Sequence, residues 1–517
     1  MPSGSWARTA VSAMGRAAPE AVAFRGHGTV RTHAESRRRA IAFAHALVAR
    51  GIGPGDRVAL VVEDRADAVE AYLGVGLAGA TAVQVNDRLQ VAEIDEVLGL
   101  AGVRAVVHTA GHAKRLEDLL RGAGTDVVSV GTRTAATTLT YEDAVAASAS
   151  LDLPHLAFDA DAPGIVGFTS GTTGRPKGVV HTHANLDRIV RHMPVHDGIR
   201  WGSRCGFTGT LAFAAGIWGV VLPHLYVGGE VSFMAGLDPE AWVERMLTER
   251  TTFTYAPTPL MGAFADRVRE SPGVLDHLDV VLHSGSLAPR ESVEDLVDAI
   301  GHRYVETYGM TETGAPVTAT VPDDWRAGST ADDPYASAGR PVTIAEIRIT
   351  DAAGTALRPG EVGEIEVASE TLFAGYLDQP DLTAEALHDG WLKTGDLGSL
   401  DASGRLYVRG RAKDMIVTGG MNVYPAEVER VLVQAVGIAD AAVFGVAHPR
   451  WGETVTAAVV AAPGVAVDLD GLTAYVRERL AGYKKPTAIH VVEALPRNAS
   501  LKVRKDELRR RFEHADD

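Results

Sequence analysis

Gly167-Phe-Thr-Ser-Gly-Thr-Thr-Gly-Arg-Pro-Lys-Gly-Val179 is the stretch of this sequence that decides the fold. Its glycines and hydroxyl side chains do not suit a core helix or strand, because glycine weakens both and polar groups need partners. Apolar, strand-like residues run into it at 161–168 and out of it at 179–180. Glycines between two anchored ends let backbone N–H groups approach a phosphate, and Lys177 adds positive charge. The stretch, called the phosphate loop below, therefore predicts a loop that wraps an oxyanion.

Two other interpretations of the phosphate loop are weaker. A Walker A loop requires Gly-Lys followed by Ser or Thr, whereas this sequence has Pro176-Lys177-Gly178. A flexible linker has a similar composition, but linkers are not usually framed by apolar strands. The anion-binding interpretation is therefore the one we carry forward.

Length, composition and charge limit the classes of function that this chain can have. A chain of 517 residues is too long for one core and predicts two or more domains. The formal charge of −16 opposes attraction to nucleic acid or an anionic membrane, which favours a small-molecule ligand in a local positive pocket. One cysteine, Cys205, excludes an internal disulfide framework and fits a reducing cytoplasm. We expect no membrane span, since glycine, proline and histidine interrupt the apolar segment 211–227 and a buried helix explains it better.

Helix-like and strand-like segments alternate along the chain. Helical spacing at 35–50, 67–78 and 92–99 alternates with strand-like runs at 57–62, 80–84 and 105–108, and a second such series covers 242–308. This alternation predicts an α/β fold of layered subdomains. Short alternating strands at 344–349 and 363–367 predict a β-rich subdomain, and residues beyond a linker near Gly410 predict a small α+β module. The basic run 502–511 reads as a solvated helix face with Leu508 and Phe512 turned inward.

Four further motifs follow the phosphate loop in order. They are Ser284-Gly-Ser-Leu-Ala-Pro289, Tyr308-Gly-Met-Thr-Glu-Thr-Gly314, Trp391-Leu-Lys-Thr-Gly-Asp396 and Gly410-Arg-Ala-Lys-Asp414. The first is not a hydrolase nucleophile elbow, because Leu282 stands where that turn needs glycine. His181-Thr-His183 does not predict a metal site, since no cysteine or second ligand pair accompanies it.

Together these motifs resemble the adenylate-forming superfamily: acyl-CoA synthetases, adenylation domains of peptide synthetases and firefly-type luciferases. The resemblance spans nearly the whole chain and implies that ATP or an acyl-adenylate (AMP) is bound. It implies that Thr311 and Glu312 act in catalysis and that Glu312 also holds Mg²⁺ against phosphate oxygens. It further implies a set of nucleotide-binding residues: Thr169, Ser170, Gly171, Thr172, Thr173, Gly174, Lys177, Gly285, Ser286, Thr307, Tyr308, Gly309, Asp396 and Arg411.

The resemblance also implies a second half-reaction with coenzyme A. A large domain of residues 1–410 would carry a mobile domain of residues 411–517, hinged at Lys413. Lys502 would bridge carboxylate and α-phosphate during adenylation, and the 419–425 loop would replace it when the thiol attacks. Residues implied at the coenzyme A site are Gly419, Gly420, Trp451, Tyr483 and Lys485.

Two departures from the family pattern concern the substrate and the chemistry. The acyl pocket implied by the resemblance contains Phe207, Ala212, Phe213, Ser284, Gly309 and Gly314. Ala212 and Phe213 stand where relatives have an aromatic residue and a histidine, which predicts a wide apolar pocket for a bulky hydrophobic acid. Leu501 replaces the glycine that characteristically precedes the catalytic lysine, which predicts impaired adenylation.

The expected protein is a cytoplasmic acid–thiol ligase that acts on a small-molecule carboxylic acid or its adenylate. A peptide-synthetase adenylation domain is normally followed by a carrier domain, and none follows Asp517. Two alternatives stay open. One is an enzyme that performs only thioesterification, with acyl-adenylate supplied by a separate adenylating enzyme. The other is a catalytically silent protein that binds acyl-adenylate or coenzyme A.

Overall fold

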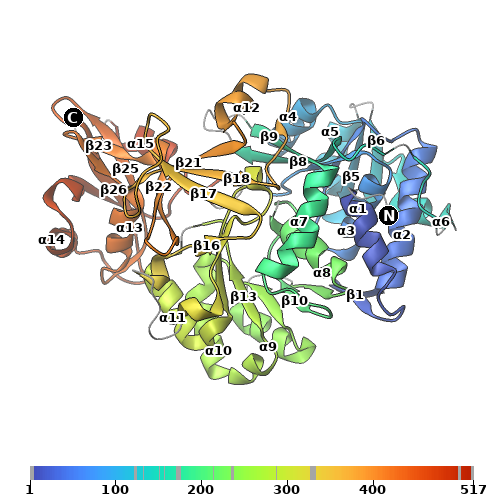
Figure 1. Cartoon of the computed structure of the whole chain (residues 1–517), viewed down its shortest axis with the longest axis horizontal. Helices are drawn as coiled ribbons and strands as arrows, with labels where there is room; N and C mark the ends of the chain where they lie inside the picture. The colour runs from blue at the N-terminus through green and yellow to red at the C-terminus, as the bar shows by residue number, and fades with distance from the viewer. Residues whose placement is uncertain are drawn as a thin grey trace. The chain divides into compact units, whose positions relative to one another are not determined.

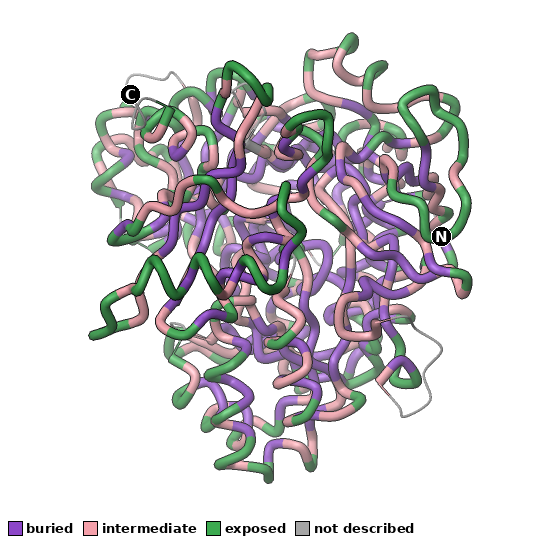
Figure 2. Tube along the Cα trace, turned by 90° about the vertical axis from the view of Figure 1, so that its left-hand side faces the viewer, coloured by how far each residue is buried: buried purple, intermediate pink, exposed green. Residues whose placement is uncertain are grey.

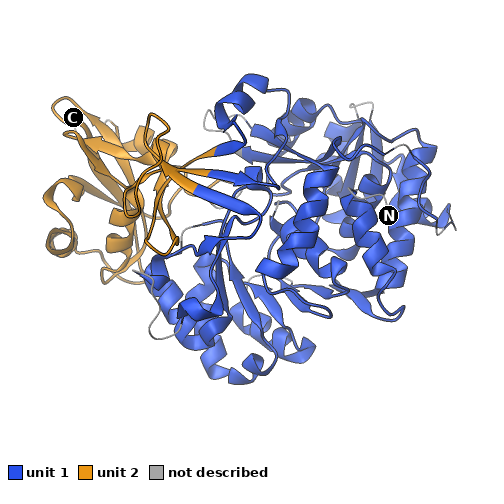
Figure 3. Cartoon of the chain, in the orientation of Figure 1, with its two compact units in different colours: residues 1–347, 367–392 blue, residues 348–366, 393–517 orange. Residues whose placement is uncertain are grey.

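The computed structural model describes residues 5–121, 125–131, 133–148, 150, 152–156, 158–170, 176–213, 215–234, 238–286, 288–325, 333–498 and 502–513. The chain divides into two compact units, residues 1–347 with 367–392 and residues 348–366 with 393–517 (Figure 3). This division places residues 393–410 with the C-terminal part, because β21 (Trp391–Leu400) pairs with β22 (Leu406–Arg411). The functional boundary at residue 410 and the hinge at Lys413 stay predictions.

The first unit is built from two large sheets and their covering helices (Figure 1). Its helices are α1 (Trp6–Met14), α2 (His33–Ala49), α3 (Ala66–Leu77), α4 (Val91–Ala101), α5 (Ala110–Arg121), α6 (Tyr141–Ala146), α7 (His183–His196), the π-helix η1 (Ala215–Val221), α8 (Leu222–Tyr226), α9 (Pro239–Glu249), α10 (Met261–Glu270), α11 (Arg290–Ile300) and α12 (Pro380–Ala386). Short 3₁₀ turns are η2 (Thr258–Leu260), η3 (Pro272–Asp276), η4 (Gly301–Arg303), η5 (Thr311–Thr313), η6 (Pro322–Trp325) and η7 (Pro334–Ala336).

One sheet has the strand order β19-β9-β8-β4-β3-β5-β6-β7. Its strands are β3 (Arg57–Val61), β4 (Thr81–Gln84), β5 (Ala105–Thr109), β6 (Asp126–Val130), β7 (Leu139–Thr140), β8 (Pro163–Ser170), β9 (Pro176–Thr182) and β19 (Gly375–Tyr376). The strands from β8 to β7 run parallel, and β9 and β19 join the edge antiparallel. The run Val58–Val61 is buried throughout, as expected for a parallel strand covered on both faces.

The other sheet has the order β16-β15-β14-β13-β12-β10-β11-β1-β2. Its strands are β1 (Val22–Gly26), β2 (Thr29–Thr32), β10 (Arg204–Phe207), β11 (Glu230–Phe233), β12 (Phe253–Tyr255), β13 (Val280–His283), β14 (Tyr304–Tyr308), β15 (Thr318–Ala319) and β16 (Arg340–Pro341). The strands from β1 to β14 along this order are parallel. The loops after β13 and β14 therefore leave the same edge of the sheet, and both carry motifs singled out in the sequence.

Sequence-local signals explain where the helices begin. Thr32 and Glu35 form a capping box at the start of α2: the Thr32 hydroxyl accepts from Glu35 N, and Glu35 Oε2 accepts from Thr32 N. Helix α2 packs along α3, and α1 contacts α3, α7 and α8. Figure 2 shows the resulting buried segments inside the fold and the exposed segments at its surface. The α/β alternation predicted over residues 35–108 is confirmed, with element ends shifted by one or two residues.

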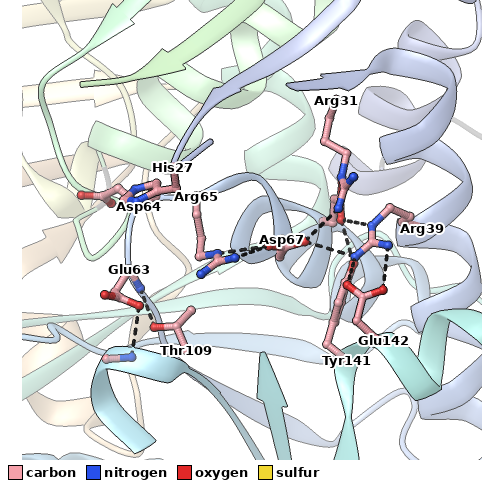
Figure 4. Close-up of polar contacts among 12 residues, drawn as sticks. His27, Arg31, Arg39, Glu63, Asp64, Arg65, Asp67, Thr109, Tyr141 and Glu142 are labelled. Atoms are coloured by element: carbon pink, nitrogen blue, oxygen red, sulfur yellow. Dashed lines mark hydrogen bonds and ion pairs between the residues drawn. The ribbon is translucent and has the colours of Figure 1, made fainter. Parts of the chain in front are cut away.

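A buried ionic cluster ties α2, α3 and α6 together (Figure 4). The Arg39 guanidinium donates to Asp67 at 3.1 Å, to Glu70 at 2.8 Å and to Glu142 at 2.6 Å. The Tyr141 hydroxyl donates to Glu70 at 3.1 Å. Burial raises the pKa of Glu70, and the adjacent Arg39 opposes that rise. Removing Arg39 would take the nearer of two cations from the buried Glu70 carboxylate, since Arg31 Nε lies 3.8 Å from it, and breaking a buried ion pair typically costs about 3–5 kcal/mol.

Within the apolar segment 211–227, Ala215–Val221 form the largely buried π-helix η1 and Leu222–Tyr226 form α8, so these residues are not one continuous α-helix. Gly216 decides part of this geometry, because a Cβ there would lie 1.9 Å from the backbone oxygen of Thr210. Within the described residues, no helix is both long and apolar enough to cross a lipid bilayer.

The division between the units falls inside three strands, β17 (Ala345–Thr350), β18 (Gly363–Ser369) and β21. These strands belong to one sheet, which also contains β20 (Leu387–His388) and has the order β17-β18-β21-β20. Strand β22 pairs with β21 outside this order. The second unit contains a further sheet, β24-β23-β26-β25, with β27 on β26. Its elements are the 3₁₀ turns η8 (Ala412–Asp414) and η9 (Gly482–Lys484), β23 (Ile416–Thr418), β24 (Met421–Val423), α13 (Pro425–Val433), β25 (Ile438–His448), β26 (Gly452–Ala461), α14 (Leu469–Arg479), β27 (Ala488–Val492) and α15 (Lys505–Phe512). Leu508 is buried and Phe512 stacks on Phe444, which confirms the predicted inward face of the basic helix.

Candidate functional site

The phosphate loop is the tip of the antiparallel hairpin β8–β9. Thr169 pairs with Lys177 and Ser170 with Pro176 in the strand register. Gly171, Thr172, Thr173, Gly174 and the side chain of Ser170 lie outside the described residues. Lys177 Nζ lies 5.4 Å from the ring centroid of Tyr376, a cation–π contact with β19 at the same sheet edge.

The Tyr308–Gly314 turn follows β14 and continues into η5. Glu312 is only 7% exposed, and its Oε1 accepts a 2.9 Å hydrogen bond from the Tyr376 hydroxyl. Tyr376 therefore contacts Lys177 with its ring face and Glu312 with its hydroxyl. A cation over the ring face and a carboxylate at the hydroxyl are therefore both held by one tyrosine.

His181 fixes the middle of this turn. Its Nε2–H donates to the Thr311 carbonyl at 2.8 Å, and its ring lies edge-on to Trp218. Burial lowers the pKa of His181 to about 4, so the imidazole is neutral at physiological pH. Glycine is required at 309, where a Cβ would lie 2.8 Å from Ala315 O, and at 314, where it would lie 2.7 Å from His181 Cε1.

The loop after β13 presents Ser284, Gly285 and Ser286. Gly285 has φ +82°, and a Cβ there would meet nothing within 4 Å, so open space borders the loop. Ser286 is exposed, and its hydroxyl lies 2.6 Å from Thr258 Oγ1. Thr307 is only 3% exposed. Its hydroxyl donates to the His283 carbonyl and does not face this space.

Two side chains hold the backbone of Leu211, which lies beside Ala212 and Phe213 of the implied acyl pocket. Asp64 accepts from Leu211 N at 2.6 Å, and Gln84 Nε2 donates to Leu211 O at 2.7 Å. Burial raises the pKa of Asp64 to about 6, and the hydrogen bond from Leu211 opposes that rise. Phe207 and Ala212 are buried, whereas Phe213 is half-buried.

Three sequence-distant segments converge at Gly167. A Cβ built there would lie 3.5 Å from Gln84 Oε1, Thr311 Cγ2 and Trp218 Cη2. The phosphate-loop strand, the Tyr308–Gly314 turn and the π-helix beside the acyl-pocket segment therefore meet at one point of the first unit.

Two predicted nucleotide residues meet in the second unit. Asp396 on β21 and Arg411 on β22 are register partners, and Arg411 Nε lies 2.7 Å from Asp396 Oδ1. Asp396 is only 6% exposed, and its ion pair with Arg411 holds the carboxylate in one orientation. Such a carboxylate accepts hydrogen bonds from hydroxyl groups of a ligand.

The predicted coenzyme A residues surround the β23–β24 turn. Gly419 N donates to Trp451 O at 2.8 Å, and Gly419 and Gly420 have φ of +57° and +80°. Trp451 is 44% exposed, and the Arg450 guanidinium lies 4.5 Å from its ring centroid. Strand β24 contacts η9, which carries the exposed Tyr483 just before Lys485.

Lys502 lies at the end of a short turn in the second unit. Its N–H donates to Asn498 Oδ1 at 2.9 Å, and Arg497 bridges to Val503. Leu501 lies outside the described residues.

Several residues that hold these groups are not marked by any sequence motif. They are Asp64, Gln84, Trp218, His283, Glu306 and Tyr376. Capping and turn motifs do not signal them, because each acts through a contact with a residue distant in sequence. Metal ligation is the only role that the sequence suggests for His181, whereas in the structure its Nε2–H donates to the carbonyl of Thr311 and fixes the turn. No group of three potential metal ligands occurs among the described residues.

Comparison with known proteins agrees with this geometry. Residues 11–377 match the family model of the AMP-binding enzyme, and residues 427–502 match that of the AMP-binding enzyme C-terminal domain. The chain belongs to the AMP-binding enzyme family. It is therefore an adenylate-forming enzyme of the acyl-CoA ligase type, with the expected α/β architecture.

Individual relatives of this AMP-binding enzyme cover nearly its whole length. It is 35% identical to a feruloyl-CoA synthase of Amycolatopsis over 96% of this chain and 97% of that protein. The amide bond synthetase McbA of Marinactinospora thermotolerans superposes with a TM-score of 0.87 at 29% identity, covering 98% of this chain and 99% of that one. The o-succinylbenzoate CoA synthetase of Bacillus subtilis, solved with its acyl-adenylate, gives a TM-score of 0.84 at 27% identity and covers 98% of each chain.

The buried carboxylate of Glu312 suits Mg²⁺, which proteins commonly bind through one or two carboxylates together with substrate phosphates. Bound there, the ion would offset negative charge on phosphate oxygens.

Proposed function

We propose that this enzyme converts a bulky hydrophobic carboxylic acid into its coenzyme A thioester through an acyl-adenylate. The observation that carries the proposal is that Tyr376 contacts both Lys177, over its ring face, and Glu312, through its hydroxyl. An ammonium group and a Mg²⁺-binding carboxylate at the edge where the phosphate loop ends are what a triphosphate requires.

In the first half-reaction, a carboxylate oxygen of the acid attacks the α-phosphorus of ATP, and the bond to pyrophosphate breaks. Lys177 would bind phosphate oxygens, and Thr311 would donate its hydroxyl to a phosphate. Lys502 would lie between the two anions and offset their repulsion. Asp396 and Arg411 would hold the ribose, and Thr169, Gly285, Ser286, Thr307, Tyr308 and Gly309 would line the nucleotide together with residues 170–174.

In the second half-reaction, the coenzyme A thiolate attacks the carbonyl carbon, and AMP leaves with the electron pair of the C–O bond. Gly419 and Gly420 lack side chains and would let the pantetheine pass. Trp451 and Tyr483 offer exposed rings, and Lys485 offers a cation, for the nucleotide end of coenzyme A. Rotation of residues 411–517 about Lys413 would exchange Lys502 for this loop.

The acid is proposed to be aromatic or polycyclic. Phe207, Ala212 and Phe213 would give an apolar wall, and Ser284, Gly309 and Gly314 would complete the pocket without bulky side chains. The names of the feruloyl-CoA synthase and the o-succinylbenzoate CoA synthetase refer to aromatic acids, which supports an aromatic substrate for this enzyme. Burying apolar ligand area contributes about 25 cal/mol per Å².

A panel of acids tests the proposal. Ferulate, 3-phenylpropionate, a steroid-type polycyclic acid and acetate are each incubated with ATP, Mg²⁺ and coenzyme A, and thioesters are detected by mass spectrometry. The large acids should give thioester and acetate should not. Parallel reactions with an amine in place of coenzyme A ask whether amide formation, the activity named for McbA, is faster. Equal use of acetate, or preference for the amine, would contradict the proposal.

A further inference from the structure

A cavity of about 520 Å³ lies in the first unit, beside helices α1 and α2. It is lined by Arg8 of α1, Arg37 of α2 and residues 152–156, called the strap below. The two helices are neighbours in the fold (Figure 1). The volume is in the range of small-molecule sites. None of the lining residues belongs to the nucleotide, coenzyme A or acyl sets, so this α1–α2 cavity is separate from the site described above.

The strap is fixed against both helices. His45 of α2 donates its Nε2–H to Asp152 O at 2.9 Å, and Arg8 Nη2 donates to Pro154 O at 3.2 Å. Leu153 packs against the hydrophobic core that includes residues of α1 and α2. The wall that the strap gives to the cavity is therefore held at three points.

The Arg37 guanidinium has no partner within the part of the chain that the structure describes. Its Nε is buried without a hydrogen-bond acceptor, and the group forms no ion pair with a described residue. By contrast, Arg39 on the same helix lies 2.8 Å from Glu70, and Arg50 at the end of that helix lies 2.9 Å from Asp126. A buried donor without an acceptor is unfavourable, and in native proteins it often marks the place of a ligand or water.

A simpler role for Arg37 would be to cap the end of α1, since cations suit helix C-termini. The side chain does approach Gly15, which ends that helix: a Cβ at 15 would lie 3.2 Å from Arg37 Nε. However, Nε donates to none of the carbonyls there. Gly15 has φ −71°, which any residue adopts, so the backbone does not require glycine. Its missing side chain leaves room for the guanidinium beside the cavity.

The lining limits the chemistry of an occupant. A guanidinium donates two parallel hydrogen bonds to a carboxylate or a phosphate. Leu153 and Leu156 are half-buried and offer apolar surface. The exposed Asp152 side chain opposes part of the positive charge of the two arginines. An oxyanion of low charge on an apolar body therefore suits the cavity better than a polyanion.

We infer that the α1–α2 cavity binds a small organic oxyanion, a carboxylate or phosphate carried on an apolar body, through the Arg8 and Arg37 guanidinium groups. The oxyanion would accept from Arg37 Nε, which supplies the missing partner, and from the Arg8 nitrogens that do not bind the strap. The apolar body would lie on Leu153 and Leu156. This site goes beyond the proposed function and does not depend on it, because it is built from other residues.

Titration calorimetry on the full chain tests the inference. The probes are phenylphosphonate and phenylacetate, with inorganic phosphate as the anion without an apolar body. Saturating ADP and Mg²⁺ fill the proposed nucleotide site, and no acyl-adenylate can form from ADP. The variants are Arg37→Met and Asp152→Asn. Arg38→Met is the matched control, because Arg38 is the next residue of α2, is exposed and does not line the cavity.

The wild type should bind at least one organic probe saturably and more tightly than inorganic phosphate, and the tighter probe identifies the anion as phosphate-like or carboxylate. Arg37→Met should weaken that binding about 10-fold or more, since a charge-assisted hydrogen bond is lost. Arg38→Met should leave it unchanged. Asp152→Asn should tighten it about 2- to 5-fold, because an exposed like charge is removed. A folding defect would not produce that gain, and thermal unfolding reports whether each variant is folded.

No saturable binding of either organic probe by the wild type, or equal affinity in Arg37→Met and Arg38→Met, would overturn the inference. Absence of thioester with every acid in the panel above would instead contradict the proposed function, and the binding of the probes would still decide the role of Arg37.

Discussion

The Tyr376 hydroxyl donates a 2.9 Å hydrogen bond to Oε1 of the buried Glu312 carboxylate. The pair joins β19 to the Tyr308–Gly314 turn, although 64 residues separate them in sequence. The Tyr376 hydroxyl is a neutral donor, so this bond orients the Glu312 carboxylate without placing a cation against it, as suits a cation ligand.

Tyr376→Phe should slow adenylation about 3- to 10-fold, because it removes one hydrogen bond to a charged group and keeps the ring beneath Lys177. The Mg²⁺ concentration for half-maximal rate should rise as well, since Glu312 loses its fixed orientation. Glu312→Gln, which keeps the shape and removes the charge, should slow the same step about 100-fold or more. Pyrophosphate release measured against Mg²⁺ concentration checks both. Wild-type rates in Tyr376→Phe at every Mg²⁺ concentration would contradict this role.

Gly216→Ala and Gly219→Ala form a matched pair on the π-helix. A Cβ at 216 would lie 1.9 Å from Thr210 O, whereas a Cβ at 219 would meet only Ala215 Cβ, at 3.9 Å. Gly216→Ala should lower the free energy of unfolding by about 1–3 kcal/mol and weaken acid binding, because the backbone beside Ala212 must shift. Gly219→Ala should be neutral or slightly stabilising. Urea unfolding measures the loss of stability, and the KM for the acid measures the weaker binding. Equal stability and equal KM in the two variants would contradict this role of Gly216.

Asp64 predicts a specific pH dependence. Burial raises its pKa from 3.8 to about 6 in the folded state. Between these values the native protein binds more protons than the unfolded chain, so this group lowers stability as pH rises from 4 to 6 and its effect is constant above 6. Asp64→Asn should remove that slope, worth at most about 3 kcal/mol, and keep an acceptor for Leu211 N.

The measurement is the difference in unfolding free energy between pH 4.5 and pH 8 for wild type and variant. Asp118→Asn serves as the control, because the Asp118 side chain is 96% exposed. If Asp64→Asn showed the same difference in unfolding free energy between the two pH values as the wild type, burial of Asp64 beside Leu211 would not be the source of the pH dependence.

Regular elements were predictable from sequence, whereas the contacts that position the site were not. Residues 304–308 were expected as a strand and form β14 over the same range, because period and flanking glycines are local signals. The partners of Glu312 and Leu211, by contrast, are Tyr376 and Asp64, and no local pattern links residues brought together by sheet order. The sequence predicts a buried helix for the segment 211–227. Its π-helical start follows from the packing of Gly216 against Thr210, which hydropathy does not encode.

Lys413→Pro tests whether residues 411–517 must turn between the half-reactions. Proline fixes φ near −65° and restricts the preceding residue, so η8 could not absorb a reorientation there. Thioester formation from supplied acyl-adenylate should fall about 10-fold or more, and pyrophosphate release should change little. Lys413→Ala keeps backbone freedom and should retain both rates. Full thioesterification by the proline variant would rule out a hinge at this residue.

Leu501 concerns the first half-reaction alone. The residue before Lys502 is characteristically glycine in the family that the sequence resembles, and glycine adopts backbone conformations closed to residues with a Cβ. Leucine restricts φ and adds an isobutyl group next to the lysine that must enter between two anions. We therefore predict slow adenylation in the wild type, with thioesterification spared because Lys502 takes no part in it.

Three variants separate the causes of slow adenylation. Leu501→Gly should raise ATP–pyrophosphate exchange about 10-fold or more, since restored charge compensation in the transition state contributes more than a kilocalorie per mole. Leu501→Ala removes the bulk but keeps the Cβ, so a full gain in that variant would assign the defect to side-chain size and not to backbone freedom. Lys502→Ala should abolish exchange in every background. Thioester formation from supplied acyl-adenylate should be the same in all of them. Robust exchange by the wild type, unchanged in Leu501→Gly, would mean that the loop seats Lys502 despite leucine and that this enzyme needs no partner to make its adenylate.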